Sequence, residues 1–270
     1  MTKKEALCVK KVWEYYKRHG RHSLPWRLTK NPYHILVSEI MLQQTQVDRV
    51  LLKYNSFLKR FPTIRELSEA SFGDVLRAWQ GLGYNRRARM LHECARQIVN
   101  ERRGLFSKTP AELMQLPGVG HYTAGAIMAF AWNMPVTIIE TNIRAVIIYH
   151  FFKDKIDISD KQVFQLTGIV LDTENPREWY YAMMDYGAHI KKTFGNPNNR
   201  SKHYTKQSAF KGSDREIRGA ILRLLAVDSY TRAQFLKKLP FEDVRIDAQL
   251  GKLFKEEMLM KKNSKYALPV

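Results

Sequence analysis

The stretch LPGVGHYTAGAI, residues Leu116 to Ile127, contains two glycines that flank a single valine. Gly118 and Gly120 permit dihedral angles and a close backbone approach that other residues resist. The stretch lies between two segments with helical spacing, so a second helix would begin just after it with free N–H groups. Such groups are a phosphate-binding site. The plain structural alternative is a tight turn between two helices.

The net charge of the chain indicates the class of molecule that it binds. The chain has 270 residues and carries 45 Lys+Arg against 26 Asp+Glu, a formal net charge of +19. This excess indicates a polyanion, either nucleic acid or an anionic membrane surface. The longest apolar runs, such as AGAIMAFAW, are too short to cross a bilayer, and the first residues contain no signal-peptide core. We therefore expect an intracellular protein of the cytoplasm or nucleoid, or of the nucleus in a eukaryote, without a membrane partner.

The cysteines limit metal chemistry. Cys8 and Cys94 are the two cysteines of the chain, which is too few for a four-cysteine zinc or iron–sulfur site. We expect both to be buried thiols, and we expect no bound metal.

The hydrophobic pattern predicts helix after helix. An apolar stripe runs from residue 33 to 61, two short helices are predicted within 63–80, and an amphipathic helix ends at Gly104. Residues 109–132 are predicted to form two helices joined by Pro-Gly-Val-Gly. No confident strand pattern occurs before residue 256.

The composition changes at residues 191–215, which are polar and basic and predict a surface loop or linker. Three helices then follow, the second with Thr231 as its N-cap. A strand, an Asn-Ser turn and a second strand end the chain. This is the order of a winged helix, a module that binds DNA or protein. We predict a helical core at 1–212, with a basic loop at 191–212, and a winged-helix-like α+β domain at 213–270.

Five segments together resemble the helix-hairpin-helix DNA glycosylases of base excision repair that include endonuclease III, and among them the A/G-specific adenine DNA glycosylases. The segments are LPWR (24–27), SEIMLQQTQVDRV (38–50), GLGYNRRAR (81–89), LPGVGHYTAGAI (116–127) and YYAMMDYGAHI (180–190). The resemblance implies a mainly α, helix-hairpin-helix glycosylase fold. It also implies a monomer that removes adenine mispaired with guanine or 8-oxoguanine from double-stranded DNA. A thymine or uracil mismatch glycosylase and a non-catalytic DNA-binding protein stay open as alternatives.

Two glutamates carry the implied chemistry, because breaking an N-glycosidic bond needs a proton for the leaving base and a counter-charge for the sugar. Glu39 matches the general acid of the family, and its alternative is an ordinary exposed helical acid. Glu140, in VTIIETNIRAV (136–146), stands where the family has an aspartate that stabilises the sugar cation. We expect Thr141 or Asn142 to cap the helix that follows. The alternative for Glu140 is a structural capping acid.

Tyr122 stands where bifunctional relatives carry a lysine that forms a Schiff base and cleaves the strand. The resemblance therefore implies a monofunctional enzyme that leaves an abasic site. Tyr122 is expected to orient Glu39 or the sugar, or else simply to pack. Asn142 is expected to position the attacking water or Glu140.

The resemblance also implies the groups that extrude a base from the duplex. The residues expected to contact DNA are Gln44, Thr45, Leu82, Tyr84, Gly118, Val119 and Gly120. The residues expected to line the base pocket are Trp26, Arg27, Leu42, Val47 and Asp185. Core packing is the alternative for the apolar and aromatic members.

Relatives in the family carry four cysteines after the segment that matches YYAMMDYGAHI, and these hold an iron–sulfur cluster. This chain has none there, so we expect no cluster and no other cofactor. The basic residues of this region are predicted to bind phosphates in its place; they are Lys191, Lys192, Arg200, Lys202 and Lys206. The C-terminal part does not match the usual end of the family, so a preference for oxidised guanine stays open.

Overall fold

The computed structural model describes residues 1–202, 204–205 and 209–269. The described residues are mainly helical, as predicted, and form two compact units that interleave along the chain. The first unit contains Met1–Glu39, Ser107–Gln115 and the described residues of Val119–Lys206, and the second contains Ile40–Phe106, Leu116–Gly118 and the described residues of Gln207–Val270. The predicted division of the chain at residues 212 and 213 stays a prediction.

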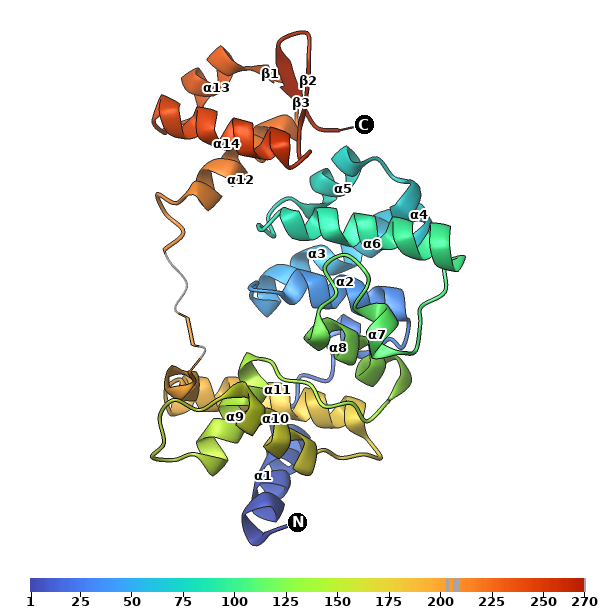
Figure 1. Ribbon diagram of the computed structural model, residues 1–270, viewed down its shortest axis with the longest axis vertical. Helices are drawn as coiled ribbons and strands as arrows, with labels where there is room; N and C mark the ends of the chain where they lie inside the picture. The colour runs from blue at the N-terminus through green and yellow to red at the C-terminus, as the bar shows by residue number, and fades with distance from the viewer. Residues whose placement is uncertain (203, 206–208, 270) are drawn as a thin grey trace. The chain divides into compact units, whose positions relative to one another are not determined.

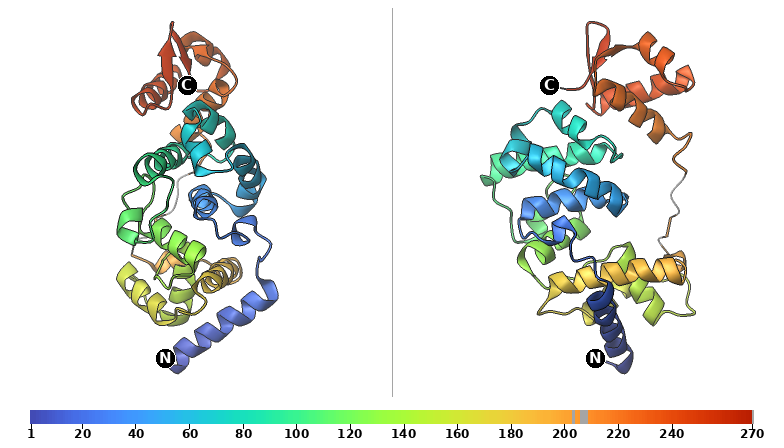
Figure 2. Two further views of the ribbon diagram at one scale, coloured as in Figure 1. Left: turned by 90° about the vertical axis from the view of Figure 1, so that its right-hand side faces the viewer. Right: turned by 180° about the vertical axis from the view of Figure 1, so that it is seen from behind.

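The first unit is a cluster of helices in which α11 packs against three others. Its elements are α1 (Lys3–His19), η1 (Pro25–Arg27), the start of α2 (Pro32–Leu42), α7 (Pro110–Leu113), α8 (His121–Trp132), α9 (Thr141–Phe151), α10 (Asp160–Ile169), α11 (Pro176–Thr193) and η2 (Pro197–Arg200). Helix α11 packs against α1, α8 and α9, and Figures 1 and 2 both show α9 to α11 side by side. Nine consecutive residues of α8, Thr123 to Ala131, are buried, so this helix is enclosed on all sides.

One glycine sets the spacing between α9 and α11. A Cβ on Gly187 would lie 2.1 Å from the backbone oxygen of Asn142. Any larger side chain would therefore push α11 away from the first turn of α9. The contact matters because Glu140 immediately precedes that turn.

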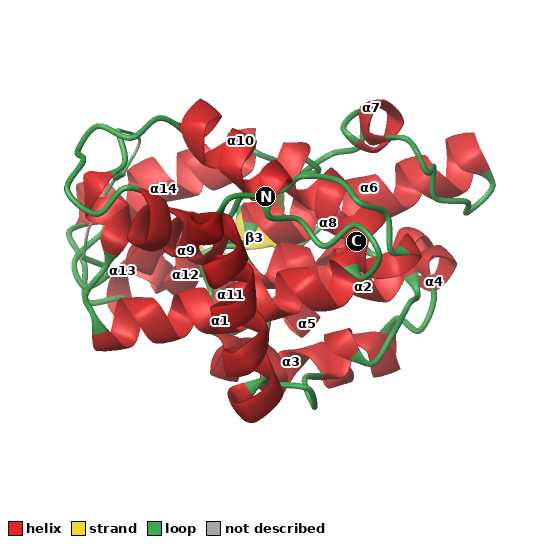
Figure 3. Ribbon diagram, turned by 90° about the horizontal axis from the view of Figure 1, so that it is seen from below, coloured by secondary structure: helices red, strands yellow, loops and turns green. Residues whose placement is uncertain are grey.

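The second unit contains the remaining helices and all the described strands. Its elements are α3 (Val47–Arg60), α4 (Ile64–Glu69), α5 (Phe72–Trp79), α6 (Arg86–Arg102), α12 (Asp214–Leu225), β1 (Tyr230–Thr231), α13 (Arg232–Lys238), α14 (Asp243–Lys255), β2 (Met260–Lys262) and β3 (Lys265–Ala267). Helix α6 packs against α4 and α5, and α12 against α14. Figure 3 shows how small the strand content is beside the helices.

The C-terminal segment has the predicted order of three helices and a hairpin. Thr231 caps α13 as expected, and Asn263 and Ser264 form the turn, with φ of 48° and 61°. The sequence analysis missed β1, which pairs with β3 to give a three-stranded antiparallel sheet in the order β1-β3-β2. A strand of two residues is too short for a detectable alternation. Whether this segment is a DNA-binding winged helix stays a prediction.

Two local expectations differ from the structure. The apolar stripe at 33–61 is divided between α2 and α3, with a break at Gln43–Gln46 where Gln44 has a φ of 54°. The residues predicted as a surface loop are partly packed, since Pro197, Asn198 and Ser201 are buried. The polar composition of this segment predicted an exposed loop, but these side chains form contacts inside the first unit. Among the described residues, no helix has the length and hydropathy needed to span a bilayer.

Candidate active site

Glu39 is a buried acid on α2, with 6% of its surface exposed. Burial raises the pKa of its carboxyl to about 7. A hydrogen bond from Tyr122 and the charge of Arg27 lower that pKa, and the negative charge of Glu140 raises it. Glu39 is therefore not an ordinary exposed helical acid. The raised pKa means that Glu39 binds a proton more readily near neutral pH than an ordinary glutamate does.

Tyr122 comes from the first turn of α8 and donates its hydroxyl proton to the Glu39 carboxylate. Its own pKa lies well above the usual range, chiefly because of burial and then because of the charges of Glu39 and Glu140. The phenol therefore stays protonated and holds the acid in place. This contact agrees with an orienting role rather than with packing alone.

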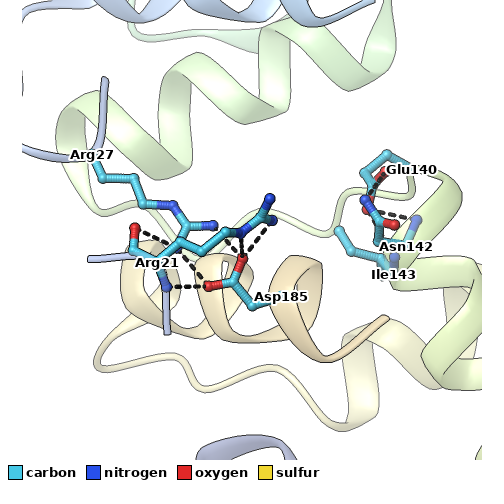
Figure 4. A network of polar contacts seen from close by, with 6 residues as sticks. All are labelled: Arg21, Arg27, Glu140, Asn142, Ile143 and Asp185. Carbon is cyan, nitrogen blue, oxygen red and sulfur yellow. Dashed lines mark hydrogen bonds and ion pairs between the residues drawn. The ribbon is translucent and has the colours of Figure 1, made fainter. Parts of the chain in front are cut away.

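Glu140 precedes α9 and is itself the N-cap of that helix. One oxygen, Oε1, accepts from the backbone N–H groups of Asn142 at 2.7 Å and Ile143 at 2.9 Å (Figure 4). The other, Oε2, accepts from the Thr141 hydroxyl at 3.1 Å and from Asn142 Nδ2 at 3.2 Å. The prediction that Thr141 or Asn142 would cap the helix is wrong. The longer glutamate side chain folds back and reaches the free N–H groups itself.

This geometry places the carboxylate of Glu140 close enough to act on Glu39. The positive end of the α9 dipole and two N–H donors stabilise the carboxylate of Glu140. Asn142, predicted to position water or Glu140, contacts Glu140 through both its backbone and its side chain. The carboxylate of Glu140 thus both carries the charge and caps helix α9.

Asp185 on α11 forms a separate ion-pair network with two arginines (Figure 4). Arg27 donates to both carboxylate oxygens at 2.8 Å, and Arg21 donates through its backbone N–H and its Nε. Burial raises the pKa of Asp185, but the two arginines outweigh burial and hold that pKa below its usual value. Arg27 also lies over the ring of Tyr181, 4.6 Å from its centroid. Asp185 therefore anchors Arg27, which faces Glu39.

The hairpin of LPGVG has the predicted backbone. Gly118 has a φ of 76°, and a Cβ there would lie 2.9 Å from the Cβ of Met90. Gly120 is the N-cap of α8 and supplies no side-chain acceptor, so it leaves N–H groups of the first turn for a ligand. Val119 between them is buried.

Two of the residues predicted to enter DNA have strained backbones. Gln44 and Tyr84 have φ of 54° and 47°, a left-handed region that costs side-chain-bearing residues about 1 kcal/mol or more. Gln44 is exposed and Tyr84 is half-buried. The hydroxyl of Tyr84 accepts a hydrogen bond from Arg215 of α12 at 2.6 Å. Leu82 is 1% exposed and packs in the core of the second unit, so its contact with DNA stays a prediction.

Arg87, which was not identified from the sequence, binds the two loops that contain Gln44 and Tyr84. Its buried guanidinium donates to the carbonyl groups of Ile40 and Met41 at the end of α2, and also to that of Gln43. It also donates to the Thr45 hydroxyl and to the carbonyl groups of Leu82 and Gly83; these bonds are 2.9, 3.2 and 3.1 Å long. Burial lowers its pKa to about 10, so it stays charged at neutral pH. The GLGYNRRAR block contains Arg87, but nothing in the sequence of that block distinguishes this buried arginine from the neighbouring arginines.

The other predicted residues differ in exposure. Trp26 is buried, Leu42, Thr45, Val47 and Lys191 are half-buried, and Lys192 and Lys202 are exposed. The Arg200 side chain donates to backbone carbonyls of its own unit, and Lys206 lies outside the described residues. The roles of these residues at DNA stay predictions.

A four-cysteine cluster does not fit this chain. Cys8 and Cys94 are both buried thiols, as predicted, and burial raises the pKa of each to about 12. The described residues contain no group of three or more His, Cys, Asp or Glu side chains placed to hold a metal ion. The segment after α11 is instead held by amide and guanidinium contacts.

A family model described as HhH-GPD superfamily base excision DNA repair protein matches residues 37–239. The chain belongs to this superfamily. The match includes Glu39, Tyr122 and Glu140, so the buried acid and its two neighbours lie in the part that defines the family.

Several curated relatives are named adenine DNA glycosylase. The one from Buchnera aphidicola subsp. Baizongia pistaciae is 38% identical over 183 residues, which is 66% of this chain and 51% of that protein. The one from Mycobacterium tuberculosis is 32% identical over 280 residues, which is 94% of this chain and 91% of that protein. A solved thermostable thymine-DNA glycosylase matches with a TM-score of 0.63 and 25% identity, over 69% of this chain and 87% of that one. The chain thus spans about half the length of the Buchnera relative.

Arg87→Lys tests the role of the buried guanidinium. A lysine keeps the charge but cannot donate to both loops, so we expect a loss of about 2–4 kcal/mol in unfolding free energy. We also expect at least about a tenfold loss of duplex affinity as the loops lose their geometry. Urea denaturation and fluorescence anisotropy measure the two effects. Arg86→Lys, on the exposed side of α6, is the matched control, and equal stability and affinity in both variants would contradict the role.

Proposed function

We propose that this protein is a monofunctional DNA glycosylase of base excision repair. Its substrate is adenine paired with guanine or 8-oxoguanine in double-stranded DNA, and it acts as a monomer. The observation that carries the proposal is the buried carboxyl of Glu39, with a pKa of about 7, held by Tyr122 and facing the charge of Glu140. The adenine glycosylase relatives support the choice of base.

In this reaction the bond between C1′ of the sugar and N9 of adenine breaks. Glu39 gives its proton to the purine, so the base leaves neutral. The sugar becomes an oxocarbenium-like cation, which the negative charge of Glu140 stabilises. A water positioned by Asn142 and Glu140 adds to C1′ and gives up one proton to a carboxylate of the site, which leaves an abasic site. Because only the protonated form of Glu39 works, base release slows as the pH rises above about 7.

The chemistry ends at the abasic site because no amine stands at position 122. The phenol of Tyr122, with its raised pKa, cannot form the Schiff base that precedes strand cleavage. It acts instead by holding Glu39. The strand therefore stays intact until another activity or alkali cleaves it.

Two other functions are kept as alternatives. The fold match to a thymine-DNA glycosylase favours a thymine or uracil mismatch enzyme. A DNA-binding protein without catalysis is the alternative from another class. A buried acid with a raised pKa argues against the latter, because a binding protein gains nothing from the cost of burying it.

A panel of duplexes separates these functions. Purified protein is mixed in excess with duplexes that contain A:G, A:8-oxoG, T:G or U:G, and half of each sample is treated with hot alkali. We expect cleavage at the adenine of the first two duplexes, only after alkali. Glu39→Gln should release no base from any of them.

Each other outcome has a distinct meaning. Excision from T:G or U:G alone supports the mismatch alternative. Duplex binding without excision supports the non-catalytic one. Cleavage before alkali treatment contradicts the monofunctional mechanism.

Glu140 variants separate its charge from its role as a cap. The amide oxygen of Glu140→Gln can still accept from the start of α9, but the charge is gone. We expect unchanged duplex affinity, a loss of about 1 kcal/mol in unfolding free energy as the interactions of the charge with the start of α9 weaken, and a loss of roughly a hundred-fold or more in the single-turnover rate. Glu140→Asp keeps the charge and is also a good N-cap. We expect it to retain most of the activity.

Single-turnover kinetics and thermal unfolding measure these effects, with Glu14→Gln on the exposed face of α1 as the control. A wild-type rate for Glu140→Gln would reduce Glu140 to a helix cap. An inactive Glu140→Asp beside an active wild type would show that the site depends on the longer side chain.

A further inference from the structure

The segment 196–202, which we call the clamp segment, follows α11 and contains η2. Asn198 is 4% exposed and Ser201 is 8% exposed, and Pro197 is also buried. A polar asparagine is rarely so buried unless its side chain has a structural task. The backbone N–H of Asn198 donates to the side chain of Asn196 at 3.2 Å, which holds the turn in shape.

The clamp segment contacts both ends of helix α9. At the start of the helix, Asn198 Nδ2 donates to the carbonyl of Thr141 at 2.9 Å. At its end, the Arg200 guanidinium donates to the carbonyl groups of Phe152 and Lys153. Phe152 and Lys153 directly follow the last residue of α9, and the Phe152 carbonyl also accepts from the backbone N–H of Lys155 at 3.2 Å. A cation at this end of a helix is favourable.

A backbone bridge holds the clamp segment in place beyond α9. The N–H of Ile158 donates to the carbonyl of Arg200 at 3.1 Å, and the N–H of Lys202 donates to the carbonyl of Ile158 at 3.0 Å. Across α9, Gly187 of α11 lies against Asn142 with no room for a side chain. The first turn of α9 is therefore restrained from two sides.

We propose that the clamp segment positions Glu140 for catalysis, with Asn198 as the positioning residue. Asn198 holds the carbonyl of Thr141, and Thr141 directly follows Glu140 in the chain. Glu140 in turn is bound to the next two N–H groups of the same turn. A shift of this turn moves the carboxylate relative to Glu39 and to the sugar. The inference rests on the proposed function, and it assigns the support of the first turn of α9 to side chains of the clamp segment.

Asn198→Ala and Asn198→Asp both test the clamp, because each removes the Nδ2 donor that binds the Thr141 carbonyl. The aspartate variant also places a carboxylate against that carbonyl. We expect the single-turnover excision rate to fall on the order of ten- to hundred-fold, since small misplacements of a reacting group have effects of that size. Duplex affinity should not change. Asn199→Ala, at the exposed neighbouring position, is the matched control and should match the wild type.

The pH profile separates positioning from a general loss of structure. The groups that face Glu39 are Tyr122, Tyr181, Arg27 and Glu140. Of the two charged groups, Arg27 lowers the pKa of Glu39 and Glu140 raises it. A displaced Glu140 therefore lets the pKa of Glu39 fall, and the alkaline limb of the rate profile moves to lower pH. A lower rate with an unmoved limb would overturn the positioning role, and so would a wild-type rate.

Hydrogen exchange tests the clamp without reference to activity. In a Glu39→Gln background, the Asn198 variants should show faster exchange of the amide hydrogens of Asn142 and Ile143, which donate to Glu140. Amide hydrogens of α1 should exchange as before. Unchanged exchange at Asn142 and Ile143 would overturn the clamp. If these amides exchange faster while the wild type excises no base from any duplex, the proposed function has failed and the clamp has not.

Discussion

The site depends on keeping a proton on a carboxylic acid at neutral pH. Water would favour ionisation of Glu39, and burial of its side chain excludes that water. Burial alone would give an acid of arbitrary orientation, and Tyr122 supplies the orientation. Glu140 then adds a negative charge that works against ionisation of Glu39. In the proposed function, these two carboxyl groups with different environments match the two roles that cleavage of a glycosidic bond requires.

The second unit contains two loops with strained backbones. Left-handed backbones at Gln44 and Tyr84 persist only where surrounding contacts over-determine them. Arg87 supplies those contacts by binding carbonyl groups from both loops with one guanidinium. A planar side chain with five donors suits this task, and a lysine does not. The strained residues Gln44 and Tyr84 and the arginine that binds their loops thus lie within the same unit.

Much of the fold was predictable from the sequence, because helical periodicity and the LPGVG hairpin are local signals. Glu39, Tyr122 and Glu140 were found through motifs, and the structure brings them together. The contacts that were missed depend on tertiary packing. No local pattern marks Arg87 as the buried arginine among several, or shows that Glu140 caps its own helix. The clamp segment has the composition of a loop, and only the partners of Asn198 and Arg200 reveal that it is packed. The short strand β1 exists because β3 pairs with it.

We infer that burial and the charge of Glu140 together hold a proton on Glu39. Carbon-13 NMR of carboxyl-labelled glutamate reports this directly, and the Glu39→Gln spectrum identifies the signal. We predict a titration midpoint near pH 7 in the wild type and a lower midpoint in Glu140→Gln. A midpoint at the ordinary glutamate value of about 4.3, unaffected by the loss of the Glu140 charge, would contradict the account.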